Sequence, residues 1–138
     1  MINFKIILNV LGYLLVALSI LLIVPIIIDL ISGNDSWKSF LISLIITLGF
    51  GVTFLLSTRN ELKNKILTQD AFLITTLSWI FISIFGALPF FFLDSSLSLT
   101  NSIFESMSGI TTTGSTIFNE VENLPQGILI WRSILQWV

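Results

Sequence analysis

The oxygen-rich run at residues 110–116, Ile-Thr-Thr-Thr-Gly-Ser-Thr, is the part of the sequence with the clearest potential for chemistry. Successive threonines branch at Cβ and favour an extended backbone over a helix. Extended backbone leaves its carbonyl oxygens unpaired within the segment, and Gly114 can adopt a conformation that other residues resist. Carbonyls and threonine hydroxyls can together replace the hydration shell of a cation. The run therefore predicts a site for a dehydrated monovalent cation; the alternative is a threonine- and serine-rich surface loop.

A short helix is predicted immediately before this run, over residues 101–109. Ile103, Phe104 and Met107 fall on one apolar face of such a helix, and Gly109 is a natural stop. About ten residues rise ~15 Å, which is half of a bilayer's hydrocarbon core. The C-terminal end of this helix would also direct partial negative charge toward the cation. A half-length helix between full spans is typical of a re-entrant segment, whereas an amphipathic interfacial helix would accompany the surface-loop alternative.

The composition excludes most other classes of protein. Of the 138 residues, 54% are hydrophobic and 10% are charged, and the mean hydropathy is +1.00. Because a soluble domain carries roughly 25% charged residues, a soluble enzyme and a disordered chain are both excluded. The absence of cysteine and histidine removes thiolate and imidazole metal ligands and the usual general base. A net charge of −2 provides no basic surface for nucleic acid. An integral membrane protein that is not an enzyme and holds no cofactor remains.

The spacing of charges predicts three membrane-spanning helices. Charge-free runs of 23, 20 and 23 residues occupy positions 6–28, 39–58 and 71–93. About 20 helical residues cross a hydrocarbon core of ~30 Å. Since lipid offers no partner for a free backbone N–H group, these runs are expected to be helices rather than open strands.

The segments between these runs predict the orientation in the membrane. Residues 32–36 form a short turn, and residues 59–70 form a polar linker. Four basic residues fall at the N-terminus and in the linker, against Lys38 alone in the region of the turn: Lys5, Arg59, Lys63 and Lys65. Because positive residues accumulate on the cytoplasmic side, we expect the N-terminus and the linker to be cytoplasmic in a multi-pass protein of the inner membrane.

Pro25 lies within the first run, where it is expected to kink the helix. A cleaved signal peptide over residues 1–33 is a competing interpretation. The apolar core of a signal peptide is about 7–15 residues long, which is shorter than this run, and no Ala-x-Ala site follows it. A retained membrane span is therefore the preferred interpretation.

The last segment, residues 125–138, is predicted to begin a helix at Pro125, because proline suits the first helical position. Its 14 residues rise ~21 Å, which is short of the hydrocarbon core. No cap or polar stop follows, so we interpret this segment as a truncated helix. Trp131 and Trp137 suit an interfacial aromatic belt.

Glu105 and Arg132 are ionisable residues in segments predicted to lie at membrane depth. Such residues are costly in lipid and are usually paired. The prediction is an ion pair that ties the short helix to the last helix. The alternative is a solvated Glu105 near the outer surface and an Arg132 that extends to the interface.

Three stretches of this sequence resemble the TrkH/KtrB/HKT superfamily of potassium uptake proteins. Residues 104–116, Phe-Glu-Ser-Met-Ser-Gly-Ile-Thr-Thr-Thr-Gly-Ser-Thr, resemble the first pore loop of that superfamily. Residues 124–137, from Leu-Pro-Gln-Gly to Leu-Gln-Trp, resemble the start of the next helix in the TrkH branch. Residues 86–90, Gly-Ala-Leu-Pro-Phe, resemble the end of the helix before the pore. Two helices ahead of the first pore unit are also a TrkH-like feature.

The resemblance implies an all-α integral membrane fold in which one polypeptide holds four helix–pore loop–helix repeats around one ion path. Residues 1–58 would form an N-terminal transmembrane hairpin, and residues 59–70 would form the cytoplasmic linker. Residues 71–138 would form the first repeat, helix–re-entrant pore loop–helix, with its last helix truncated.

The resemblance also implies the site and the partners. Potassium would be held by the carbonyls of Thr112, Thr113 and Gly114 and by the hydroxyl of Thr112, with Thr111 and Ser115 as neighbours in one quarter of a selectivity filter. Ser115 stands where potassium channels place an aromatic residue, so this wall would be less braced. The partners would be membrane lipid, the remaining pore repeats, a cytoplasmic nucleotide-binding regulatory subunit and a second copy in a homodimer.

Two functions are therefore weighed. The first is potassium transport, with the chain as the N-terminal part of a Trk-type uptake subunit. The second is a small non-transporting membrane anchor or interaction protein. An enzyme ranks far behind both, because the sequence contains no nucleophile–base set and no metal cluster.

Overall fold

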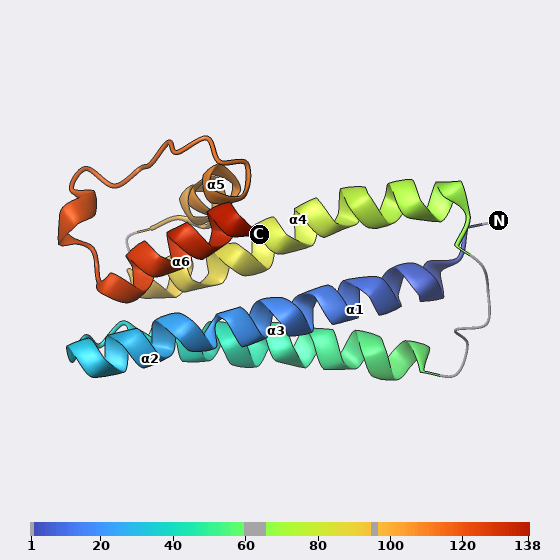
Figure 1. Cartoon of the computed structure of the whole chain (residues 1–138), viewed down its shortest axis with the longest axis horizontal. Helices are drawn as coiled ribbons and strands as arrows, with labels where there is room; N and C mark the ends of the chain where they lie inside the picture. Colours follow the sequence, from blue (N-terminus) through green and yellow to red (C-terminus); the bar gives the residue numbers. More distant parts are fainter. Residues whose placement is uncertain (1, 60–65, 95–96) are drawn as a thin grey trace.

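The computed structural model describes residues 2–59, 66–94 and 97–138. Within these residues every regular element is helical, which confirms the predicted all-α class for this part of the chain (Figure 1). The elements in chain order are α1 (Phe4–Leu21), α2 (Ile23–Ser32), α3 (Trp37–Thr58), α4 (Thr68–Leu93), α5 (Leu99–Ile110), a 3₁₀ turn η1 (Val121–Asn123) and α6 (Gln126–Trp137).

Three helical stretches are long and apolar enough to cross a membrane, as the charge spacing predicts. They are Phe4–Ser32, formed by α1 and α2, Trp37–Thr58 and Thr68–Leu93. α4 begins at Thr68, so residues 68–70 of the predicted linker are helical. The rest of that linker is largely beyond the described residues, and Lys63 and Lys65 are among the residues left out.

The helices α1 to α4 lie roughly alongside one another (Figure 1). The N-terminus, the end of α3 and the start of α4 lie at one end of the molecule, and the α2–α3 turn lies at the other. Lys5 is in the first turn of α1 and Arg59 follows α3, so these two basic residues share an end, opposite Lys38 in the first turn of α3. That this end is cytoplasmic stays a prediction.

The helix is interrupted between α1 and α2, close to Pro25, where the sequence predicts a local disturbance of the helix. α1 ends at Leu21 and α2 begins at Ile23, just before Pro25. A proline has no N–H group to donate to the carbonyl four residues earlier, and its ring crowds that carbonyl. Leu22 keeps helical torsion angles of −65° and −19°, so the two helices continue as one span.

Small residues bring α1 and α3 close together. A Cβ atom on Gly12 would lie 3.0 Å from the Leu55 side chain, and one on Gly51 would lie 3.0 Å from Val16. Asn9 Nδ2 donates a 2.8 Å hydrogen bond to Thr58 Oγ1 across the same interface. Close backbone approach and interhelical hydrogen bonds are the main means of association in lipid, where hydrophobic burial contributes little.

The prediction that Trp131 lies in an interfacial belt is wrong. Trp131 is fully buried, its ring packs edge-on against Phe40, and its Nε1–H group donates a 3.0 Å hydrogen bond to the carbonyl of Gly86. A buried indole needs such an acceptor, and the helical turn before Pro89 in α4 supplies one. Trp137 is 92% exposed.

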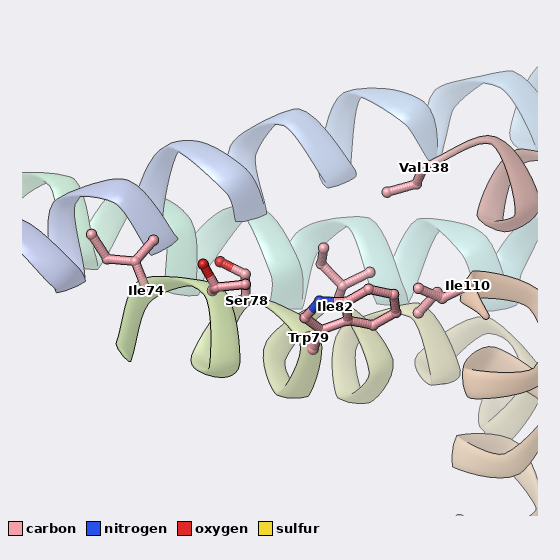
Figure 2. A pocket seen from close by; sticks show the side chains of 7 residues that line it. Ile74, Ser78, Trp79, Ile82, Ile110 and Val138 are labelled. Carbon is pink, nitrogen blue, oxygen red and sulfur yellow. The ribbon is translucent and has the colours of Figure 1, made fainter. Parts of the chain in front are cut away.

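A groove of about 360 Å³ runs along α4 beside Ile110, the last residue of α5 (Figure 2). Ile74, Ser78 and Ile82 project from α4 into the region between α4 and α1, and Val138 approaches from the end of α6. The lining residues carry no charge, so this groove offers little to hold an ion.

Candidate functional site

The short helix α5 is anchored at its start and runs beside α4 and α6. Ser98 caps it by accepting a 3.1 Å hydrogen bond from the N–H group of Asn101. Gly86 allows α5 to approach α4 closely, since a Cβ atom there would lie 2.7 Å from Ser106 Oγ. α5 spans Leu99–Ile110, so it begins and ends within two residues of the predicted bounds, 101–109.

The buried face of α5 is polar. Four hydroxyl or carboxyl side chains on it are buried: Ser102, Glu105, Ser106 and Ser108. Phe104 and Met107, from the predicted apolar face, are instead 47% and 39% exposed. This arrangement suits a helix whose outer face contacts hydrocarbon and whose inner face carries hydrogen bonds.

The chain does not leave α5 in extended form, so the prediction of extended backbone from residue 110 onward is wrong at its start. Ile110 is still helical, and Thr112 has a φ of +56°. The N–H groups of Thr112 and Thr113 donate 3.0 Å hydrogen bonds to the carbonyls of Gly109 and Ser108. This is the Schellman closure of a helix C-terminus. Satisfying the last carbonyls of α5 outweighs the preference of threonine for extended backbone.

Beyond this turn the chain is irregular through Glu120 and returns to the end of the molecule where α4 ends and α6 begins (Figure 1). Gly114 has a φ of +78°, in the left-handed region that glycine adopts readily. The irregular residues 113–120 are called the returning segment here. The hydroxyl of Ser108 donates a 2.6 Å hydrogen bond to the carbonyl of Ser115, which holds the returning segment against α5.

Three of the predicted ligand groups accept no hydrogen bond from the part of the chain that the structure describes. Within the described residues, no hydrogen bond reaches the carbonyls of Thr112, Thr113 and Gly114. Thr111 Oγ1 donates to the carbonyl of Met107 at 2.8 Å and lies 2.8 Å from Thr113 Oγ1. Residues 111–116 are all exposed on this chain, so they form one open wall. Such a wall can supply oxygen ligands to one side of a cation.

Glu105 joins α5 to the returning segment and to α6. Its side chain is fully buried, and its Oε1 atom accepts a 2.7 Å hydrogen bond from the N–H group of Ile117 and a second one from the hydroxyl of Thr116. Its Oε2 atom lies 3.4 Å from Nε of Arg132, whose side chain is 15% exposed. The structure thus brings Glu105 and Arg132 together, and the alternative of a solvated Glu105 does not describe this chain.

No sequence pattern predicts Thr116 and Ile117 as partners of Glu105, because they are 11 and 12 residues away. None predicts a role for Asp29, which is fully buried. Asp29 accepts a 2.7 Å hydrogen bond from the N–H group of Gly127, 98 residues away. Such contacts between distant segments require the folded structure.

Comparisons with known proteins agree on one family. A family model described as "TrkH: Cation transport protein" matches residues 36–138. The Trk system potassium uptake protein TrkH of Halomonas elongata is 39% identical over 99% of this chain. The protein of the same name from Escherichia coli K12 is 35% identical over 98% of this chain. This chain spans 28% of the length of each of these two relatives.

A solved structure has the same arrangement of helices. The crystal structure of the potassium transporter TrkH from Vibrio parahaemolyticus matches 99% of this chain with a TM-score of 0.91 and 31% identity, and the match covers 29% of that protein. The alternative of a small non-transporting membrane anchor is not favoured, since the relatives are described as uptake proteins and transporters. Three candidate spans and the family match together identify a multi-pass membrane protein. This chain belongs to the TrkH family of cation transport proteins.

Proposed function

We propose that this chain takes part in potassium transport across the inner membrane, with its N-terminus in the cytoplasm. Its residues 71–138 contribute one helix–pore loop–helix repeat, and residues 1–58 form a transmembrane hairpin ahead of it. The short helix α5 enters the membrane partway from the outer side, and the chain after it returns to that side. The coverage of 28% of the relatives' length supports a role as one part of a larger pore.

The carbonyls of Thr112, Thr113 and Gly114 form one quarter of the ion cage, together with the hydroxyl of Thr112. The observation that carries this assignment is that these three carbonyls accept no hydrogen bond from the described residues. Bare carbonyl oxygens at membrane depth are tolerated where they line an aqueous path, and a potassium ion is a suitable partner for them. Thr111 and Ser115 flank the cage, and both are engaged by α5.

The remaining walls of the cage come from further pore repeats of the complete transporter. A cytoplasmic nucleotide-binding subunit gates it, and two copies assemble as a homodimer. Membrane lipid covers the outer faces of the spanning helices.

The substitution Gly114→Ser tests the assignment in the complete transporter that carries this segment. A serine at a φ of +78° is strained and should displace the adjacent carbonyls. We expect the preference for potassium over sodium to fall by about tenfold, which corresponds to a change of about 1.4 kcal/mol. Gly49→Ser is the control, since Gly49 lies in α3, away from the loop, and a Cβ atom there meets nothing within 4 Å. Unchanged ion preference in Gly114→Ser would refute the assignment.

A further inference from the structure

The last turn of α2 is hydrogen-bonded to the first turn of α6 through a buried carboxylate. Asp29 has no exposed surface, and its two oxygens have separate donors: Oδ1 accepts from the N–H group of Gly127 at 2.7 Å, and Oδ2 accepts from the hydroxyl of Ser36 at 2.6 Å. Beside this contact, the hydroxyl of Ser32 donates a 2.7 Å hydrogen bond to Oε1 of Gln126. Two elements far apart in the chain are therefore held together at the end of the molecule opposite the N-terminus (Figure 1).

Asp29 supplies a cap that α6 lacks. The residue at the N-cap position of α6 is Pro125, and no side chain of its own caps the helix. The first N–H groups of a helix have no partner within the helix, and the N-terminus carries partial positive charge. A carboxylate from α2 meets both needs. Gly127 is required for this contact, since a Cβ atom there would lie 2.3 Å from Oδ2 of Asp29.

The helix that Asp29 caps carries Arg132. Arg132 lies five positions after Gly127, a rise of about 7.5 Å along the helix. Arg132 Nε lies 3.4 Å from Oε2 of Glu105, and Oε1 of Glu105 holds the N–H group of Ile117 and the hydroxyl of Thr116. Polar contacts at Gly127 and at Arg132, joined by the backbone of α6, thus link the N-terminal hairpin to the irregular segment that follows Gly114.

We propose that Asp29 is a positioning residue for the ion-binding loop. By holding the start of α6, Asp29 sets the position of Arg132 against Glu105. Glu105 in turn holds the returning segment at Thr116 and Ile117. The assignment of an ion to this loop rests on the proposed function, but the mechanical link does not. The N-terminal hairpin is, on this proposal, a support for the ion path as well as a membrane anchor.

Hydrogen exchange of this chain in lipid nanodiscs tests the link without reference to transport. In Asp29→Ala we expect amide exchange to rise at least about tenfold at Gly127 and also at Ile117, because the N–H group of Gly127 loses its acceptor and that of Ile117 loses the support of Glu105. Asp35→Ala is the matched control: Asp35 is an exposed aspartate of the same turn region that pairs with Lys38, and its loss should change neither site. Faster exchange at Gly127 with unchanged exchange at Ile117 would overturn the proposal.

Ser36→Ala covers the case in which Asp29→Ala does not accumulate in the membrane. It removes the donor to Oδ2 and leaves the Gly127 contact in place. Loss of the Ser36 donor loosens the Asp29 carboxylate, so a smaller rise in exchange is expected at Gly127 and at Ile117. A rise at Gly127 alone would again overturn the proposal. Asp29→Asn should restore most of the protection lost in Asp29→Ala, because an amide oxygen can accept from Gly127 while its NH₂ group faces the Ser36 hydroxyl.

Ion preference in the complete transporter separates this proposal from the proposed function. Asp29→Ala should reduce the ratio of potassium to sodium uptake by several-fold at equal protein level, whereas Asp35→Ala should leave it unchanged. If the unmodified transporter carries no potassium, the proposed function fails while the exchange result still decides the link. If potassium transport is present and its ion preference does not respond to Asp29→Ala, the positioning role fails alone.

Discussion

The carboxylate of Glu105 accepts a hydrogen bond from the backbone N–H group of Ile117 at 2.7 Å, and the Glu105 side chain is fully buried. One carboxylate therefore contacts both the returning segment and the guanidinium group of Arg132. A buried charge is stable only when it is paired or hydrogen-bonded, and Glu105 has both kinds of partner.

The Glu105–Arg132 pair should show strong coupling. Removing one partner leaves the other charge buried without its counter-charge, so Glu105→Gln and Arg132→Gln should each destabilise the chain more than the double substitution does. We expect a coupling energy of about 1–3 kcal/mol from a double-mutant cycle on thermal unfolding in detergent. The exposed pair Asp35–Lys38 is the control and should show a coupling of about 0–1 kcal/mol. Equal stability of all three Glu105 and Arg132 variants would contradict the pairing.

Thr112→Gly should stabilise the chain. Thr112 has a φ of +56°, where a β-branched side chain is strained, and glycine adopts this conformation freely. The free energy of unfolding should rise by about 1 kcal/mol, less the loss of any contact that the threonine side chain makes. Thr113→Gly is the control, because Thr113 does not have a positive φ, and there glycine should destabilise instead. Chemical denaturation in mixed micelles measures both, and a loss of stability in Thr112→Gly would count against strain at this turn.

Gly86→Ala should separate α4 from α5. The new methyl group would lie 2.7 Å from Ser106 Oγ and 3.2 Å from the Leu135 side chain, so the helices must move apart. Overpacking of this kind costs about 1–3 kcal/mol. Gly49→Ala in α3 is the matched control, because a methyl group there meets nothing within 4 Å and alanine favours a helix by about 1 kcal/mol. Thermal unfolding should therefore move in opposite directions for the two variants, and a shift in the same direction would refute the packing argument.

The 138-residue chain by itself should not conduct potassium. A selectivity filter requires a closed ring of carbonyl oxygens, and here residues 111–116 form a single exposed wall. Flux of potassium or rubidium into liposomes that contain the chain should equal that of empty liposomes. Robust uptake that is absent in Gly114→Ser would mean that copies of the chain close a ring by themselves.

The sequence alone determined the features that depend on neighbouring residues. The spacing of charges located the three spans, Pro25 located the break between α1 and α2, and the residues around Phe104 and Gly109 located the short helix α5. Hydrophobicity, backbone propensity and helical rise act over a few turns of chain, so they can be read without knowing the fold.

The folded structure determines which groups meet across the molecule. It placed Trp131 in the core, where its indole finds the carbonyl of Gly86, and it joined Asp29 to Gly127 over 98 residues. The chain turns at Thr112 because hydrogen bonds to the last carbonyls of α5 stabilise it more than the extended backbone that threonine prefers. These outcomes depend on how whole helices pack, and the partners that compete for each buried polar group are known only when the helices are in place.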